Sequence, residues 1–195
     1  MNYLAHVYLS GDDKELLVGN FIADAVKGNT MNNFSDGIRR GIVLHRSIDE
    51  FTDRHPLHKA SRTKLHERYG HYSGVMIDIF YDHYLANNWA DYSDKPLKEY
   101  TEKVYALIES YHDILPERIS YMLQYMVPQN WLLNYAKLEG IERVLKGMAS
   151  RAKFESSMET GVEELKLYNS EFETEFRQFF PELIQFVNTK IEEDL

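Results

Sequence analysis

Apolar residues recur three and four positions apart along almost the whole chain, and this helical period constrains the fold more than any other feature. In the clearest segment the spacing is followed by Ile38, Ile42, Leu44, Ile48 and Phe51. No stretch alternates apolar and polar residues over the length of a strand with hairpin turn residues at its end. The pattern therefore predicts an all-α protein.

Prolines and capping residues divide this pattern into separate helices. Ser35 can cap one helix, and Pro56 and Pro96 suit the first turn of two others. We expect helices at residues 14–27, 35–51, 56–70, 74–89, 96–111, 116–128, 139–152 and 158–179, and a last helix that starts at Pro181. The chain has no linker rich in Gly, Ser or Pro and no internal repeat. Residues 1–195 are therefore expected to form one single-domain helical bundle.

Composition excludes several kinds of chemistry and partner. The absence of cysteine excludes disulfides, zinc–thiolate sites and thiol nucleophiles, and it is compatible with the cytoplasm. The N-terminal segment has no basic start, unlike a signal peptide, and no apolar run approaches the roughly 18 residues of a membrane helix. The net charge of −9 argues against nucleic acid as a partner. We expect a cytoplasmic protein that binds neither nucleic acid nor membrane.

Positive charge is concentrated in one segment of this acidic chain. Residues 27–68 hold nine Lys and Arg against five acids, a net charge of +4, so the rest of the chain carries −13. Such a segment can be a docking surface for an anionic partner, or it can be the solvated face of ordinary helices. The candidate partner-binding residues are Arg39, Arg40, Arg54 and Arg62.

Acids and histidines spaced one helical turn apart are the candidate functional residues. His45 and Asp49 continue the apolar stripe of Ile38 and Ile42, so the pair is expected to point inward. A buried carboxylate needs a cation or several hydrogen-bond donors. A metal ion bound by both residues would meet this need. A His–Asp hydrogen bond inside the bundle is the alternative.

A second set of acids lies in the predicted helix at residues 74–89. Asp78 and Asp82 share one face of this helix, and His83 follows directly. Two carboxylates one turn apart repel each other unless a cation lies between them or one is protonated. The alternative is a pair of exposed acids on an amphipathic helix.

Asp24 and His6 complete the candidates. Asp24 lies between apolar neighbours, although Lys27 could pair with it at the surface. His6 also has apolar neighbours, where a lone histidine is more often a core residue than a ligand.

Together these residues indicate a divalent metal site. Oxygen-rich ligand sets with one or two imidazoles suit Mn²⁺, and also Mg²⁺ or Fe²⁺. Such an ion lowers the pKa of water, while Lys27 and Arg46 could neutralise a phosphate. The chain has no Gly-rich phosphate loop, no HExxH motif and no GxSxG motif. The pattern favours phosphoester hydrolysis.

Seven ordered blocks carry a resemblance to a known family. They are MNYLAH, GNFIADAVKG, GIVLHRSIDEFTDRHP, IDIFYDHYLANNW, QNWLLNYA, KGMASR and EFRQFFPEL. In order and spacing these blocks resemble the bacterial acyl carrier protein phosphodiesterase family, also called holo-ACP hydrolases. The resemblance implies an all-helical, HD-like phosphohydrolase architecture and Mn²⁺ as cofactor. It implies hydrolysis of 4′-phosphopantetheine from the serine of holo-acyl carrier protein, which gives the apo-carrier.

The resemblance also implies roles for individual residues. The acid and histidine positions of the family fall on His6, Asp24, His45, Asp49, Asp78, Asp82 and His83. We expect Asp24, His45, Asp78 and Asp82 to bind the metal directly. His6, His83 and Asp49 are expected to bind it or to orient its ligands, and Asp49 is counted with Lys27 and Arg46 among the catalytic residues. The usual HD signature is an adjacent His-Asp, whereas this chain has Asp82-His83.

Acyl carrier proteins are small, acidic and helical, so the basic segment fits such a partner. Two alternatives stay open. The chain could be a related metal phosphohydrolase that acts on a small phosphodiester or nucleotide. It could also be a non-catalytic helical module that binds an acidic partner, with the acid–histidine pairs as core hydrogen bonds.

Overall fold

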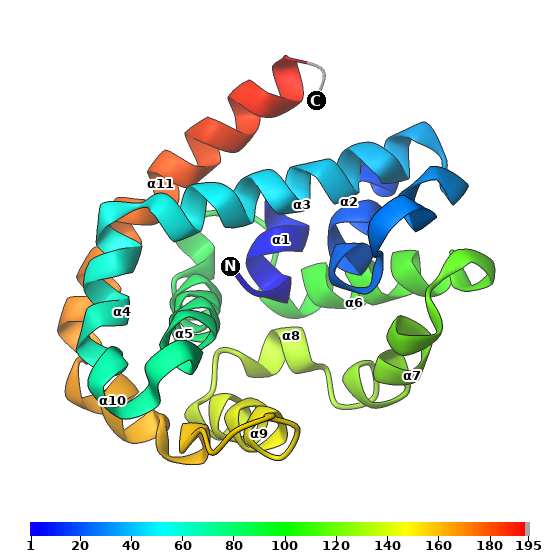
Figure 1. Cartoon of the computed structure of the whole chain (residues 1–195). Helices are drawn as coiled ribbons and strands as arrows, with labels where there is room; N and C mark the ends of the chain where they lie inside the picture. Colours follow the sequence, from blue (N-terminus) through cyan, green and yellow to red (C-terminus); the bar gives the residue numbers. More distant parts are fainter. Residues whose placement is uncertain (194–195) are drawn as a thin grey trace.

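Helices make up all the regular structure in the computed structural model, which describes residues 1–193 (Figure 1). The α-helices are α1 (Tyr3–Leu9), α2 (Lys14–Ile22), α3 (Asp36–Arg54), α4 (Pro56–Tyr69), α5 (Ser73–Asn87), α6 (Leu97–Glu109), α7 (Glu117–Met126), α8 (Trp131–Asn134), α9 (Leu138–Ala149), α10 (Val162–Leu167) and α11 (Asn169–Glu192). Short 3₁₀ helices cover Ala23–Ala25, Gly28–Asn33, Gly70–Tyr72, Trp89–Asp91, His112–Ile114 and Met158–Thr160. No strand occurs within residues 1–193, so the predicted all-α fold is confirmed.

The helices pack around one shared apolar core, and α1 lies near its centre. In the view of Figure 1, α3 crosses above α1, α5 and α6 lie to either side, and α8 and α9 lie below. Five of the seven residues of α1 are buried. An isolated helix of this length is unstable in water, so its packing against the surrounding helices must hold it in place. The prediction that residues 1–195 form one domain stays a prediction, and residues 194 and 195 lie outside the described part.

Helices α2 and α3 cross with their backbones in contact at Gly19 and Gly41. A Cβ atom at Gly19 would lie 2.1 Å from the carbonyl oxygen of Ile38, and one at Gly41 would lie 2.2 Å from that of Leu16. Only glycine fits at either position. Because His45 lies one turn after Gly41, this crossing brings its side chain onto the C-terminal part of α2.

The sequence patterns did not predict α1, because a distant side chain stabilises its start. Asp82 on α5 accepts hydrogen bonds from the backbone N–H groups of Leu4 (2.7 Å) and Ala5 (3.1 Å). The first N–H groups of a helix have no partner within the helix, and a carboxylate at this end also interacts favourably with the helix dipole. Asn2, the local capping residue, makes no side-chain cap bond.

Three predicted helix boundaries were wrong. The helix expected at residues 14–27 ends at Ile22 and continues only as the 3₁₀ turn Ala23–Ala25, after which Val26 is extended. The helix expected at residues 158–179 is divided into a 3₁₀ turn, α10 and the start of α11. Pro181 does not begin a helix but lies inside α11.

Burial of aromatic residues explains why α11 continues through Pro181. A proline inside a helix costs about 3 kcal/mol, because it removes a backbone hydrogen bond and crowds the preceding turn. On both sides of it, Phe176, Phe179, Phe180 and Leu183 are fully buried. Each such side chain contributes about 1.5–3 kcal/mol, so their burial outweighs the local cost.

No helix within residues 1–193 combines the length and the apolar character that a membrane crossing needs.

Candidate metal centre

Three side chains from two helices converge beside α1. His6 comes from α1, and His45 and Asp49 come from α3, where they lie one turn apart. One potential ligand atom from each lies within 4.8 Å of the others. His6 Nε2 is 3.2 Å from Asp49 Oδ1, and His45 Nε2 is 3.1 Å from Asp49 Oδ2. The carboxylate of Asp49 therefore faces both imidazoles, one with each oxygen.

The Nε2 atoms of His6 and His45 lie 3.1–3.3 Å from carboxylate oxygens, as ion-pair neighbours and not as partners in hydrogen bonds of good geometry. His6 Nε2, His6 Nδ1 and His45 Nε2 are buried and have no hydrogen-bond partner among the described residues. Buried polar groups normally have partners, and an unpaired one costs about 1–3 kcal/mol. Ligand atoms that surround an ion point at a common centre instead of at one another. The donor set thus fits a divalent metal ion.

Asn20 on α2 bonds to both histidines, to the ring of His45 and to the backbone of His6. The backbone oxygen of Asn20 lies 2.9 Å from His45 Nδ1, which must donate the hydrogen bond. In a neutral His45 this leaves the lone pair on Nε2, the nitrogen that faces Asp49. The side-chain amide of Asn20 donates to the carbonyl oxygen of His6 (2.8 Å) and to Ser10 Oγ (2.9 Å). Asn20 is fully buried and was not a predicted site residue.

Asp24 joins the cluster from the 3₁₀ turn after α2. Its Oδ1 lies 3.3 Å from His45 Nε2, and its side chain is 63% exposed. Asp49 is 41% exposed, so the cluster is open to solvent on the side of these two carboxylates. A substrate can reach it there.

Asp78 lies next to the cluster but has its own cationic partners. Its Oδ1 is 3.2 Å from the amino nitrogen of Met1 and 3.1 Å from His58 Nε2 on α4. The same nitrogen of Met1 is 3.4 Å from Asp49 Oδ1 and so links the two acids. His58 was not predicted, although its place on the buried stripe with Ser61 and Leu65 was a usable signal.

The structure does not bring Asp82 and His83 into the cluster. Asp82 is fully buried and holds the first N–H groups of α1. His83 Nδ1 lies 2.7 Å from the carbonyl oxygen of Tyr135, to which it donates. Asp82 therefore joins α5 to the start of α1, and His83 joins α5 to the residue after α8.

Burial and neighbouring charges shift the pKa values of the cluster in opposite directions. Burial opposes the charge of His45, but the carboxylates of Asp24 and Asp49 outweigh it and raise its pKa to about 9. Burial and the neighbouring His45 lower the pKa of His6 to about 4. Burial disfavours the charge of Asp49, yet the adjacent imidazoles hold its pKa well below the usual range. At neutral pH the cluster holds one protonated imidazole, one neutral imidazole and two carboxylates.

Burial raises the pKa of Asp82 to about 7. The backbone N–H groups of Leu4 and Ala5, which donate to this carboxylate, lower the pKa but do not offset the burial. The pKa of Asp78 is lowered instead, because the Met1 ammonium and His58 outweigh its burial.

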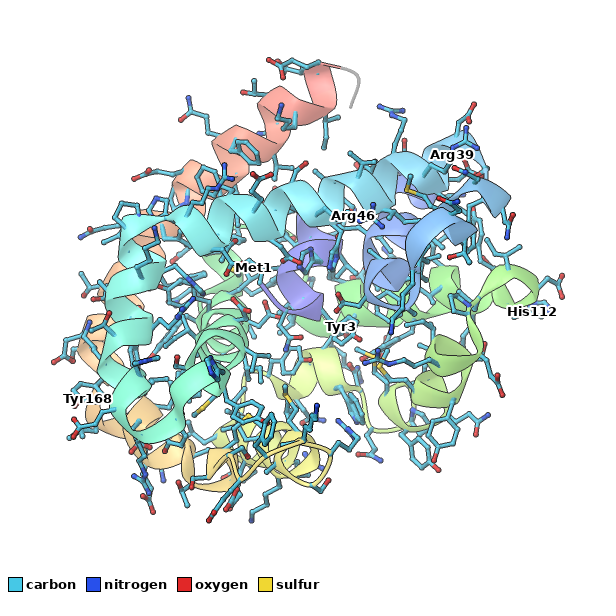
Figure 2. The ribbon with its side chains drawn as sticks, viewed as in Figure 1. Met1, Tyr3, Arg39, Arg46, His112 and Tyr168 are labelled. Atoms are coloured by element: carbon cyan, nitrogen blue, oxygen red, sulfur yellow. The ribbon has the colours of Figure 1, made fainter. Side chains whose placement is uncertain are left out.

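Lys27 and Arg46, the predicted phosphate-binding residues, are exposed, and their side chains have no hydrogen bond or ion pair within residues 1–193. Figure 2 shows Arg46 on α3, near Met1 and Tyr3 in this view. The guanidinium of Arg46 is therefore exposed and unpaired within residues 1–193.

The predicted partner-binding arginines are spread along α3 and α4. Arg39 pairs with Asp36, and Arg54 pairs with Glu50 at 2.7 Å. Arg40 is half-buried. Arg62 lines a shallow surface hollow on α4 with Lys59, Thr63 and His66. Arg39 and Arg54 are thus partly neutralised by acids of their own helix.

The fold and the cluster define an all-helical protein with a candidate His–His–Asp metal centre. The profile of the family described as acyl carrier protein phosphodiesterase matches residues 1–183. The chain belongs to this family, and the resemblance predicted from the sequence blocks is confirmed.

Curated relatives match over almost their entire length. A protein of Pectobacterium atrosepticum named acyl carrier protein phosphodiesterase is 32% identical over 191 residues, which cover 97% of this chain and 99% of the relative. A protein of the same name from Photorhabdus laumondii is 32% identical over 195 residues, with 97% and 96% covered. No solved structure matches the chain, so the HD-like architecture stays a prediction.

Proposed function

We propose that this chain is a metal-dependent phosphodiesterase that hydrolyses 4′-phosphopantetheine from the serine of holo-acyl carrier protein. Its family and its full-length relatives carry the name of this activity. The observation that carries the proposal is the convergence of His6, His45 and Asp49, with the Nε2 atoms of both imidazoles buried, facing Asp49 and without a hydrogen bond.

The residues that would hold the ion are His6, His45, Asp49 and Asp24. Two imidazoles and two carboxylates suit Mn²⁺ or Fe²⁺ better than Mg²⁺, which favours oxygen ligands alone. An ion bound there would supply Lewis-acid chemistry and would make water acidic enough to ionise near neutral pH. Asp78 is a further candidate ligand because the amino nitrogen of Met1 joins it to Asp49. We assign Asp82 and His83 to positioning, since both bond to backbone groups of neighbouring segments.

Protein side chains would bind and orient the phosphodiester. Arg46 and Lys27 can pair with its non-bridging oxygens, because both are exposed and unpaired among residues 1–193. Such pairs stabilise the charge that develops on those oxygens. Asp49 keeps both imidazoles in place and is ionised at all working pH values, as its lowered pKa implies.

The basic residues of α3 and α4 would dock the acidic carrier. The chain as a whole carries −9, so attraction of an acidic protein requires local positive charge. Arg39, Arg40, Arg54 and Arg62 lie on these helices, and Arg62 and Lys59 border one surface hollow. The proposal places the protein in the cytoplasm. A chain without cysteine does not depend on disulfides and is compatible with that reducing compartment.

A mass-spectrometric assay tests the proposed function. Holo-acyl carrier protein is incubated with the protein and Mn²⁺, and the carrier is expected to lose the mass of its phosphopantetheine group. Chelation by EDTA should abolish the loss, and added Mn²⁺ should restore it. If holo-carrier stays intact while bis(4-nitrophenyl) phosphate is hydrolysed, the chain acts on small phosphodiesters instead. If neither is hydrolysed and Mn²⁺ does not bind, the chain is a non-catalytic module.

A further inference from the structure

A second concave site lies between α8 and α9, apart from the cluster. It is a cavity of about 150 Å³, and its wall includes Gln129, Trp131, Asn134, Arg143, Val144 and Arg151. Two sequence blocks, QNWLLNYA and KGMASR, supply most of this wall. Neither block contributes to the metal cluster.

The spacing of residues on α9 builds the cavity. Gly140, Arg143, Val144 and Gly147 recur three and four positions apart on α9 and so lie on one helix face, and Arg151 follows in the turn after the helix. A Cβ atom at Gly140 would lie 1.9 Å from the carbonyl oxygen of Asn134, so glycine lets α9 pack directly against the end of α8. A Cβ atom at Gly147 would meet only the Arg151 guanidinium, at 3.9 Å. The missing side chain at Gly147 therefore leaves space in the cavity.

The wall offers hydrogen-bond donors beside apolar surface. The guanidinium groups of Arg143 and Arg151 make no ion pair with any carboxylate in the described part of the chain. Arg143 donates only through Nε, to the carbonyl oxygen of Glu139 at 3.3 Å. Trp131 and Val144 supply apolar surface in the same wall. The cavity suits a slender chain that carries carbonyl oxygens and methyl groups.

The position of the cavity relates it to the cluster. In the view of Figure 1, α3 lies above α1, whereas α8 and α9 lie below it. Figure 2 shows Tyr3, on α1, below Met1 in the same view and so toward the side where α8 and α9 lie. Burial raises the pKa of Tyr3 most and the Asp24 carboxylate raises it further, while Arg118 and Arg151 lower it.

The scissile phosphodiester joins a bulky carrier to a slender arm. With the phosphorus at the cluster and the carrier on the basic residues of α3 and α4, the arm must leave on another side. A folded carrier cannot enter a cavity of about 150 Å³, but part of an arm can. The arm consists of amides, a hydroxyl and a pair of methyl groups, which match the donors and the apolar wall.

We propose that the cavity between α8 and α9 binds the pantetheine arm of the substrate, with Arg143 and Arg151 donating to its carbonyl oxygens and Trp131 packing on its methyl groups. This inference rests on the proposed function. It names the part of the substrate that distinguishes holo-carrier from a simple phosphodiester.

Free pantetheine, which has neither phosphate nor carrier, is the probe. We expect it to bind the full-length protein in calorimetric titrations, with and without Mn²⁺, and to compete with holo-carrier. Gly147→Leu fills the cavity, and the double variant Arg143→Ala/Arg151→Ala removes the donors. Each should weaken pantetheine binding at least about tenfold, the first because the new side chain excludes the arm and the second because hydrogen bonds from charged groups are lost. Each should also lower holo-carrier turnover relative to bis(4-nitrophenyl) phosphate by a similar factor.

Lys146→Leu is the matched control, because Lys146 is on the same helix but pairs with Glu142 at the surface. It should bind pantetheine as the parent does. Pantetheine binding that is absent from the parent, or unchanged in Gly147→Leu and in the double arginine variant, overturns the inference. If holo-carrier is not hydrolysed but pantetheine binding still depends on Gly147, the proposed function fails and the cavity assignment stands.

Discussion

The imidazole rings of His6 and His45 stack, with ring centroids 4.0 Å apart and planes inclined by 16°. They come from α1 and α3, two helices that α2 separates in the sequence. At this distance two positively charged imidazolium rings would repel each other, so only one of the two rings is in the charged, doubly protonated form. The carboxylates of Asp24 and Asp49 favour that proton on His45, and His6 stays neutral. A neutral ring at neutral pH is ready to bind a metal ion.

Replacement of His6 or His45 should remove metal binding. We expect His6→Ala and His45→Ala each to weaken Mn²⁺ binding by more than about tenfold, or 1.4 kcal/mol, because each removes an Nε2 atom that faces Asp49. Calorimetric titration with Mn²⁺ measures the change. His112→Ala is the control, since this histidine is 74% exposed and Figure 2 shows it far from Met1. Unchanged Mn²⁺ affinity in both cluster variants would contradict the proposed centre.

Mn²⁺ affinity should rise with pH. In the metal-free protein the pKa of His45 is raised to about 9, so this ring is protonated at pH 7 and a bound ion must displace its proton. The apparent affinity should therefore increase about tenfold for each pH unit up to about 9 and then level off. His6, with its pKa lowered to about 4, adds no slope in this range. Titrations in buffers of different ionisation enthalpy would count the released proton, and a flat profile between pH 7 and 8.5 would refute the assignment.

Asp82→Ala should destabilise the fold rather than act only on the metal. The variant leaves the N–H groups of Leu4 and Ala5 without an acceptor, and each lost bond to a charged group costs about 1.5–3 kcal/mol. Chemical denaturation should show a lower free energy of unfolding. Mn²⁺ affinity should fall less than in His45→Ala. A variant that unfolds like the parent but no longer binds Mn²⁺ would instead support direct ligation, as the sequence resemblance implied.

Asn20→Ala tests the orientation of the two histidines. The change removes the buried amide that donates to the carbonyl oxygen of His6 and to Ser10 Oγ, so each of these groups keeps only its bond to the other. We expect a loss of about 1–3 kcal/mol of stability and weaker Mn²⁺ binding, while the backbone contact to His45 remains. Thermal melts with and without Mn²⁺ separate the two effects. The idea fails if the melts of variant and parent coincide under both conditions.

Gly41→Ala should force α2 and α3 apart. The new Cβ atom would lie 2.2 Å from the carbonyl oxygen of Leu16, an overlap that only a backbone shift can relieve. Overpacking of this kind costs about 1–3 kcal/mol, and here it should also displace His45 from Asn20. Gly74→Ala is the matched control, because its Cβ would meet only Arg62 Cδ at 3.7 Å. Equal unfolding midpoints for both variants would contradict the close crossing.

Helix α5 shows where prediction from sequence succeeded and where it stopped. Its helical period was visible, and so was the shared face of Asp78 and Asp82. The two acids nevertheless have different partners: Asp78 faces Met1 and His58, whereas Asp82 faces the start of α1. The spacing of two residues on a helix gives their common direction, but the partners come from other helices. Pro181 gave a misleading signal for the same reason, since its local cost was outweighed by distant aromatic contacts.

The sequence by itself determined the helical class, the family and the pairing of His45 with Asp49. These depend on residues a turn apart or on ordered blocks along the chain, so local spacing is enough to read them. Only the tertiary structure decided that His6 joins the pair and that Asp82 does not. Helix α1 is too short to be stable alone, and its place depends on burial and on bonds from α5. The centre therefore forms only when α1, α2, α3 and α5 pack together.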